Sequence, residues 1–287
     1  MAGYIERYYS NEFDSVIDHR DLTLRIYDYV LTLKLRVWMR QMNPPAGQLT
    51  FQAFDARGDS ATAERWVAGE WENFRNEFKR QSYRAWNNAF VLIPPASYKG
   101  FVDPDGVRRK VRCFLQIDFH ETGGDGVHTI ECYRIAKNGG HLRANVKLLS
   151  TWNLTPATKS SDVVKPIQYK QEDGKMRVSG GNPGGQTYSW QQHAFPHEVG
   201  HLLGLGHITD ASGACKKSGP NSKGCYGLYL NDAINIMGAG DALDVKNAEP
   251  WKNRIVKHAP GTHVAHWGVD FASPEARLRG LWSIRSV

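Results

Sequence analysis

Four histidines and one glutamate lie within the stretch HAFPHEVGHLLGLGH, which spans residues 193 to 207. If this stretch is helical, His197 and His201 project from one face about one turn apart, so both imidazoles can bind the same metal ion. Glu198 is adjacent and supplies a carboxylate that can accept a proton beside the metal. The residue types and their spacing therefore predict a metal centre that activates water.

The residues after this helix complete the ligand set. Gly204 comes three residues after His201, where a residue without a side chain can leave the helix in a left-handed conformation. His207 follows three residues later and can reach the metal from outside the helix. Catalytic zinc sites hold three protein ligands and keep one position open, whereas structural sites close all four. We therefore predict one catalytic Zn²⁺ bound by His197, His201 and His207, with Glu198 as the general base.

The stretch HEVGHLLGLGH resembles the zinc signature of the metzincin metallopeptidases at every fixed position. Downstream, AINIMGAG resembles the Met-turn of the same family. This resemblance implies that Met237 lies beneath the zinc-binding imidazoles as a hydrophobic base. Ala239 stands where some subfamilies place a tyrosine near the metal, so the resemblance assigns no subfamily.

The resemblance also implies an architecture. We expect an α+β fold in which the N-terminal lobe, at about 1–206, contains a mixed twisted sheet with helices. An active-site cleft separates it from a smaller, irregular C-terminal lobe at about 207–287, and the whole chain, 1–287, forms one metallopeptidase domain. By analogy, HLRANVKLL, which starts at His141, is the edge strand that pairs with an extended substrate.

Hydrophobic periodicity predicts several further elements. LTLKLRVWM (31–39) alternates as a strand with one buried face. Residues 61–90 form a long amphipathic helix behind a Ser60 cap and before Pro94 and Pro95. Further predicted elements are a hairpin of strands 111–119 and 127–135, a strand at 141–152 and a helix at 244–258.

The four cysteines suggest two disulfides. Cys113 and Cys132 lie symmetrically about the turn ETGGDG, so a tight hairpin would place them opposite each other. Cys215 and Cys225 bracket a short polar loop that a bridge could close. Two disulfides would imply an oxidising environment, whereas cysteines buried as small apolar groups are the alternative.

Other polar residues near the motif receive weaker assignments. We expect His193 outside the metal's ligands, and the histidines of KHAPGTHVAHW on the surface: His258, His263 and His266. Three oxygen-bearing residues downstream have the chemistry of calcium ligands, but their spacing matches no calcium loop: Asp210, Asn221 and Asp232. The glycine-rich segment 171–187 has no periodicity and is expected to be a functional loop.

Composition narrows the class of protein. With 287 residues and 41% apolar content the chain can bury a substantial core. It contains no run of eighteen apolar residues, so we predict no membrane-spanning segment, and its first thirty residues do not resemble a signal peptide. The net charge of +7 is spread along the chain without a dense basic run interleaved with aromatics, which predicts no nucleic-acid binding.

These observations favour a zinc endopeptidase that hydrolyses peptide bonds in a protein or peptide substrate. The predicted disulfides, without a recognisable signal peptide or propeptide, suggest a secreted or exported toxin or effector restrained by an inhibitor or immunity protein; a cytoplasmic enzyme is the alternative. Two other functions remain open: a peptidase of cell-wall peptide crosslinks, which a basic protein could approach through acidic polymers, and a binding module that zinc only stabilises.

Overall fold

A computed structural model describes residues 4–8, 11–18, 28–56, 58–102, 106–162, 167–170, 176–179, 187–208, 230–281 and 285–286. The chain divides into two compact units, each made of three segments. The first unit comprises Met1–Thr155, Ala194–Leu205 and Val245–Arg277, and the second comprises Pro156–His193, Gly206–Asp244 and Leu278–Val287. No single cut in the chain therefore separates them.

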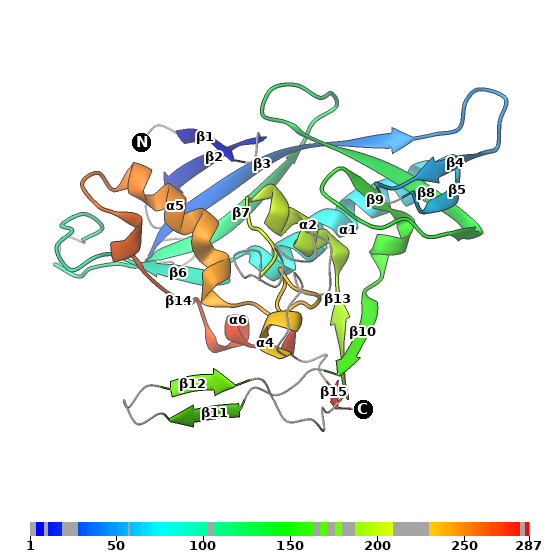
Figure 1. The fold of residues 1–287 in the computed structure, drawn as a ribbon. Coiled ribbons are helices and arrows are strands. Elements are labelled where there is room, and N and C mark those ends of the chain that lie inside the picture. Colours follow the sequence, from blue (N-terminus) through cyan, green and yellow to red (C-terminus); the bar gives the residue numbers. More distant parts are fainter. Residues whose placement is uncertain are drawn as a thin grey trace. The chain divides into compact units, whose positions relative to one another are not determined.

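The first unit contains a ten-stranded sheet and most of the helices (Figure 1). Its strands are β1 (Tyr4–Tyr8), β2 (Asn11–Asp18), β3 (Tyr29–Met42), β4 (Thr50–Phe54), β5 (Ser60–Glu64), β6 (Phe90–Ile93), β7 (Val111–Phe119), β8 (His128–Gly140), β9 (Leu148–Ser150) and β14 (Gly268–Phe271). Its helices are α1 (Ala68–Trp86), η1 (Thr151–Leu154), α2 (Ala194–Leu202), η3 (Val245–Ala248), α5 (Glu249–His258), η4 (Val264–His266) and α6 (Pro274–Arg277).

The second unit is smaller. Its described elements are β10 (Ala157–Asp162), β11 (Ile167–Lys170), β12 (Met176–Ser179), β13 (Thr187–Gln192), α4 (Leu230–Ala233) and β15 (Arg285–Ser286). Strands β10, β13 and β15 form one antiparallel sheet, and β11 pairs with β12. A small apolar cluster that includes Tyr188, Trp190 and Ile234 packs β13 against the segment after α4.

Strand β3 is the centre of the large sheet. The predicted alternation is confirmed, because the odd-numbered side chains from Leu31 to Met39 are buried while their neighbours remain partly exposed. β3 pairs in parallel with β7 and β8 and antiparallel with β2, so the sheet is mixed. The buried face packs on α1 and α5, and α1 in turn contacts α2. The expectation of an α+β fold with a mixed sheet is therefore confirmed.

The predicted hairpin of 111–119 and 127–135 is wrong, although both segments are strands. β7 pairs with one side of β3 along its first half, and β8 pairs with the other side along its second half. The turn between them crosses β3, and a Cβ added at Gly123 would lie 2.9 Å from the Trp38 ring. The short separation of the two strands in the sequence suggested a hairpin. In the structure each strand pairs with the long apolar strand β3 and not with the other.

This crossing also overturns the predicted disulfide between Cys113 and Cys132. Cys113 is in register with Leu31 and Cys132 with Gln41, so about 30 Å of β3 lies between the two positions. Both are free and fully buried, and burial raises the pKa of each thiol well above its ordinary value. The pair gives no support to an oxidising environment. Cys215 and Cys225 lie outside the described residues.

Thiol counting tests this correction. Denatured, unreduced protein should expose both Cys113 and Cys132 to a thiol reagent, so the count should fall by two in the double variant Cys113→Ala/Cys132→Ala. In the native protein both should react only as fast as the chain opens, because thiolates are the reactive form and these thiols are buried and neutral. An unchanged count in the double variant would show that the two cysteines are bridged.

Helix α1 is shorter than predicted. Residues 60–64 form β5, in which Ala61 and Ala63 are buried against neighbouring strands, and the helix begins at Ala68 after Val67 as its N-cap. Ser60 is therefore not the cap. The predicted apolar face holds for Trp71, Phe74 and Phe78, which are buried, whereas Val67 is 55% exposed.

Of two further predicted elements, a helix is confirmed and a strand is mostly wrong. The helix predicted at 244–258 is confirmed, since η3 and α5 run continuously from Val245 to His258. The strand predicted at 141–152 is mostly wrong, because β8 ends at Gly140 and β9 covers only Leu148–Ser150. The proposed substrate-pairing segment HLRANVKLL is therefore largely loop.

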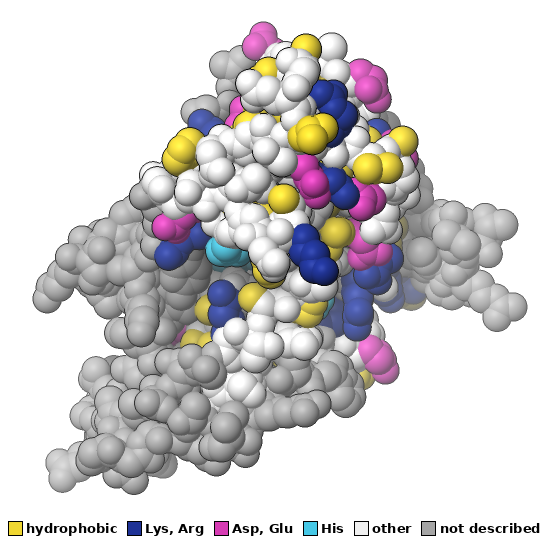
Figure 2. All heavy atoms as spheres, turned by 90° about the vertical axis from the view of Figure 1, so that its right-hand side faces the viewer, with side chains coloured by type: hydrophobic (Ala, Val, Ile, Leu, Met, Phe, Trp, Pro, Cys, Tyr) yellow, Lys and Arg dark blue, Asp and Glu magenta, His cyan; other side chains and the backbone are white. Residues whose placement is uncertain are grey.

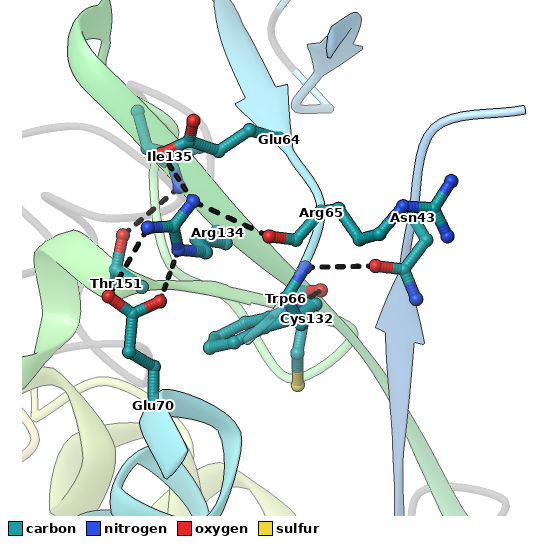
Figure 3. A network of polar contacts seen from close by, with 9 residues as sticks. All are labelled: Asn43, Glu64, Arg65, Trp66, Glu70, Cys132, Arg134, Ile135 and Thr151. Atoms are coloured by element: carbon teal, nitrogen blue, oxygen red, sulfur yellow. Dashed lines mark hydrogen bonds and ion pairs between the residues drawn. The ribbon is translucent and has the colours of Figure 1, made fainter. Parts of the chain in front are cut away.

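A polar network ties α1 to the neighbouring strands (Figure 3). Arg134 of β8 forms an ion pair with Glu64 at 2.6 Å and hydrogen bonds to both carboxylate oxygens of Glu70, in the first turn of α1. The Trp66 indole N–H donates to the Cys132 carbonyl at 2.9 Å. These contacts fix the start of α1 against the sheet.

Charged side chains are mixed on the surface. On the face shown in Figure 2, Lys and Arg side chains are interspersed with Asp, Glu and apolar groups. Among the described residues, no helix is both long and apolar enough to cross a lipid bilayer.

His128, at the start of β8, is an unusual buried group. Its side chain is 3% exposed, and neither ring nitrogen has a hydrogen-bond partner among the described residues. Burial, with a smaller contribution from the nearby positive charge of Arg36, lowers the pKa of His128 to about 4. The imidazole is therefore neutral in the folded protein at neutral pH.

This histidine predicts loss of stability in acid. Its pKa in the unfolded chain is about 6.5, so its contribution is fully present above that pH and is lost as the pH falls from about 6.5 to about 4. The full effect is about 3 kcal/mol. Urea unfolding across this range should show a smaller loss in His128→Leu than in the wild type. Parallel pH profiles for the two proteins would contradict the assignment.

Candidate metal centre

Helix α2 carries the predicted metal-binding residues, and its start is held by α1. The Phe195 ring is fully buried and packs edge-on against Phe74 and Phe78, with centroid distances of 5.3 and 5.5 Å. The Trp86 indole N–H donates to the Pro196 carbonyl at 2.9 Å. Pro196 lies in the first turn, where a backbone N–H has no partner within the helix, so the proline is tolerated.

The end of α2 follows the predicted glycine geometry. Gly204 adopts a φ of 92°, in the left-handed region. The Leu205 N–H donates to the Gly200 carbonyl and the Gly204 N–H to the His201 carbonyl, both at 2.9 Å. This pair of bonds is a Schellman motif, which reverses the chain immediately after the helix. His207 follows this turn by three residues.

The three predicted ligands come together. The metal-binding atoms of His197, His201 and His207 all lie within 4.8 Å of one another. The His197 and His201 rings are 4.8 Å apart at 89°. The His201 Nδ1 lies 2.7 Å from the Leu205 carbonyl oxygen, which can only accept a hydrogen bond. Nδ1 therefore carries the proton, and Nε2 is left as the metal-binding nitrogen.

The donor set fits zinc. A tetrahedral zinc ion with Zn–N bonds of about 2.05 Å requires its nitrogen ligands to be about 3.3 Å apart. The three ligand atoms lie within 4.8 Å of one another, so the largest of their separations must shorten when zinc binds. A three-histidine group can hold a metal ion, and it is the single group of this kind among the described residues. Three neutral nitrogens suit zinc better than calcium, which prefers oxygen ligands.

Glu198 lies next to the first ligand on α2 and is 6% exposed. Burial raises the pKa of Glu198 to about 8. A cation held by the adjacent imidazoles would favour the ionised carboxylate and oppose this shift. A bound metal ion would therefore lower the pKa of Glu198 from this value.

The turn that contains Met237 belongs to the second unit. Met237 is 1% exposed, and its carbonyl accepts a hydrogen bond from the N–H of Ile208, the residue after His207, at 3.0 Å. The Asn235 side chain accepts from the Met237 N–H at 2.8 Å. A Cβ at Gly240 would lie 2.1 Å from the Ile234 oxygen, so this tight turn requires glycine.

The same turn holds the residue that precedes α2. Asp241 accepts the His193 backbone N–H at 2.7 Å through one carboxylate oxygen and contacts His193 Nδ1 at 2.6 Å through the other. The Trp190 indole N–H donates to the Ala239 carbonyl at 2.8 Å. His193 is therefore a positioning residue. Sequence reasoning missed Asp241, because an aspartate in a glycine-rich turn gives no distinct signal.

The remaining candidates do not join the three-histidine group. His258 Nε2 lies 3.0 Å from the buried Ser15 hydroxyl. The rings of His263, the N-cap of η4, and His266, at its end, are 5.7 Å apart. Asp232 lies in α4. Asp210 and Asn221 lie outside the described residues, as does most of the loop 171–187.

Comparison of the chain with protein-family models found no match. No curated protein sequence matches it significantly. No solved structure matches it significantly either. The site is therefore interpreted from its own residues.

The Schellman turn predicts how metal binding depends on Gly204. An alanine there would hold a left-handed conformation that costs about 1–2 kcal/mol, and shifting the turn to relieve this strain would displace His207. Gly204→Ala should lower the zinc affinity about tenfold, measured by competition with a chromophoric chelator. Gly261→Ala is the matched control, because Gly261 also has a positive φ, of 81°, and open space around it. Both variants should lose thermal stability. Equal zinc affinities for Gly204→Ala and Gly261→Ala would contradict the prediction.

Proposed function

We propose that this protein is a zinc-dependent endopeptidase. The observation that carries the proposal is the convergence of three imidazoles, from His197, His201 and His207, beside the buried carboxyl group of Glu198. The resemblance of HEVGHLLGLGH to the metzincin zinc signature supports the same reaction class. The substrate class is a peptide bond in a protein or peptide chain.

Each residue has a defined task in this proposal. A bound zinc ion supplies an activated water and polarises the scissile carbonyl. Glu198 accepts the proton of the attacking water and delivers it to the leaving amine. The Leu205 carbonyl keeps His201 in the tautomer that binds metal, and Phe195 keeps α2 in place.

A catalytic site explains the residues better than a structural one. Structural zinc sites usually have four protein ligands, whereas the group formed by the described residues has three. A purely structural site also has no need of a buried carboxylic acid, because burying such a group costs free energy unless it is used or paired. We therefore favour hydrolysis over a zinc-stabilised binding module.

Peptide cleavage tests the proposal directly. The wild type, loaded with one equivalent of zinc, should generate new termini in a diverse peptide library, detected by mass spectrometry. Glu198→Gln should lose at least about a hundredfold in kcat/KM, because the proton acceptor is removed, while still binding zinc. Glu249→Gln, an exposed carboxylate on α5, is the control and should cleave normally. Equal rates for wild type and Glu198→Gln would exclude the assigned general base.

Chelation separates catalysis from a structural role. Removing zinc with a chelator should abolish cleavage while leaving most of the circular dichroism signal, because the apolar side chains of β3, α1 and α5 form a core that needs no metal ligand. Readdition of zinc should restore activity. Unfolding on mild chelation would instead indicate that zinc stabilises the fold.

A further inference from the structure

The second half of β3 has an unpaired edge. β7 follows β3 as far as Val37, whose carbonyl accepts the His120 N–H at 2.9 Å. β8 pairs with Val37–Met42 on the opposite side. Among the described residues no strand continues β7 alongside residues 38–42.

The register shows which backbone groups face this edge. The Tyr29 N–H and the Val37 carbonyl both bond toward the β7 side. Because N–H and C=O groups alternate in direction along a strand, Met39 and Gln41 point the same way. They present two donor–acceptor pairs about 7 Å apart, a spacing that another extended backbone matches.

A pocket of about 360 Å³ lies at this edge. It is lined by residues of β3, of α1 and of the turn after β7: Trp38, Met39, Arg40, Gln41, Trp71, Arg75, His120 and Glu121. The Arg75 guanidinium lies 4.6 Å from the centre of the Phe119 ring, which holds it at the pocket wall. The pocket can therefore accept a side chain from a strand paired with β3.

The charges of the pocket favour an acidic side chain. Arg75 is 3.6 Å from Glu72. The separation of Arg75 from Glu72 exceeds hydrogen-bond length, so the Arg75 N–H groups can donate to another carboxylate. Arg75 of α1 and the buried side chain of Met39 lie on the same face of β3, so a carboxylate that enters on this face would be close to the Arg75 guanidinium. Glu121 also lines the pocket, and Arg75 is the charged group of α1 in it.

We propose that the free edge of β3 at Met39 and Gln41, with its pocket, binds an extended peptide segment that carries an acidic side chain. The backbone of the segment pairs with β3, and its carboxylate contacts Arg75. None of the lining residues belongs to the three-histidine group. The proposal is therefore independent of peptide hydrolysis.

Binding is measured by fluorescence anisotropy with the probe fluoresceinyl-Gly-Thr-Val-Glu-Val-Thr-Val-amide. The full chain carries Glu198→Gln so that the probe is not cleaved. Two further probes carry N-methyl groups on alternate amides, one on the Val set and one on the Thr and Glu set. Strand pairing uses only one set, so one of these probes should bind and the other should not.

Variants of the edge test the same contacts from the protein side. Gln41→Pro removes an N–H that points at the open edge and should weaken binding about fivefold, the effect of one hydrogen bond. Gln41→Ala keeps the N–H and is the matched control. Arg75→Met should reduce discrimination between the probe and its Gln-for-Glu version, whereas Arg75→Lys should largely retain it. Circular dichroism checks that each variant is folded.

Three outcomes would overturn the proposal. The first is no binding of the acidic probe, and the second is equal binding of both N-methylated probes, which would indicate association through charge alone. The third is a dimer in sedimentation that Gln41→Pro dissociates, which would make this edge an interface between two copies of the chain.

Discussion

The position of the metal-binding helix depends on the burial of one aromatic ring. Phe195 is inaccessible to solvent and packs between Phe74 and Phe78 of α1, which itself rests on the sheet. Burying a phenylalanine contributes about 1.5–3 kcal/mol, and each edge-on ring contact adds about 0.5–1.5 kcal/mol. Because Phe195 precedes His197 by two residues, ordinary core packing sets where the imidazoles point.

A second constraint is local and uses hydrogen bonds. The turn around Met237 binds residues on both flanks of the histidine segment: Asp241 holds His193 before α2, and the Met237 carbonyl holds Ile208 after His207. Rigid placement of ligands requires such support, since a displacement of an ångström is enough to weaken a metal site. The structure gives Met237 this backbone role, and its role as a hydrophobic base beneath the imidazoles stays a prediction.

The sequence predicted local features better than pairings between distant segments. The three histidines, the left-handed Gly204 and the alternation of β3 each depend on a short stretch, and the structure contains all of them. The prediction of a Cys113–Cys132 disulfide was wrong because it assumed that two strands adjacent in the sequence pair with each other. Periodicity identifies a strand, but it carries no information on which strand lies beside it. Asp241 was missed because an aspartate in a glycine-rich turn gives no distinct signal and its partner, His193, lies 48 residues away.

The central place of β3 has a consequence for synthesis of the chain. Its parallel partner β7 begins at Val111, 82 residues after Tyr29. At about 5–20 residues per second, the ribosome needs roughly 4–16 s to supply that partner. During this interval one side of a long, apolar, β-prone strand is without its native neighbour, and such strands readily pair with other chains. Producing this protein in quantity therefore depends on conditions that slow aggregation of the nascent chain, such as low temperature or added chaperones.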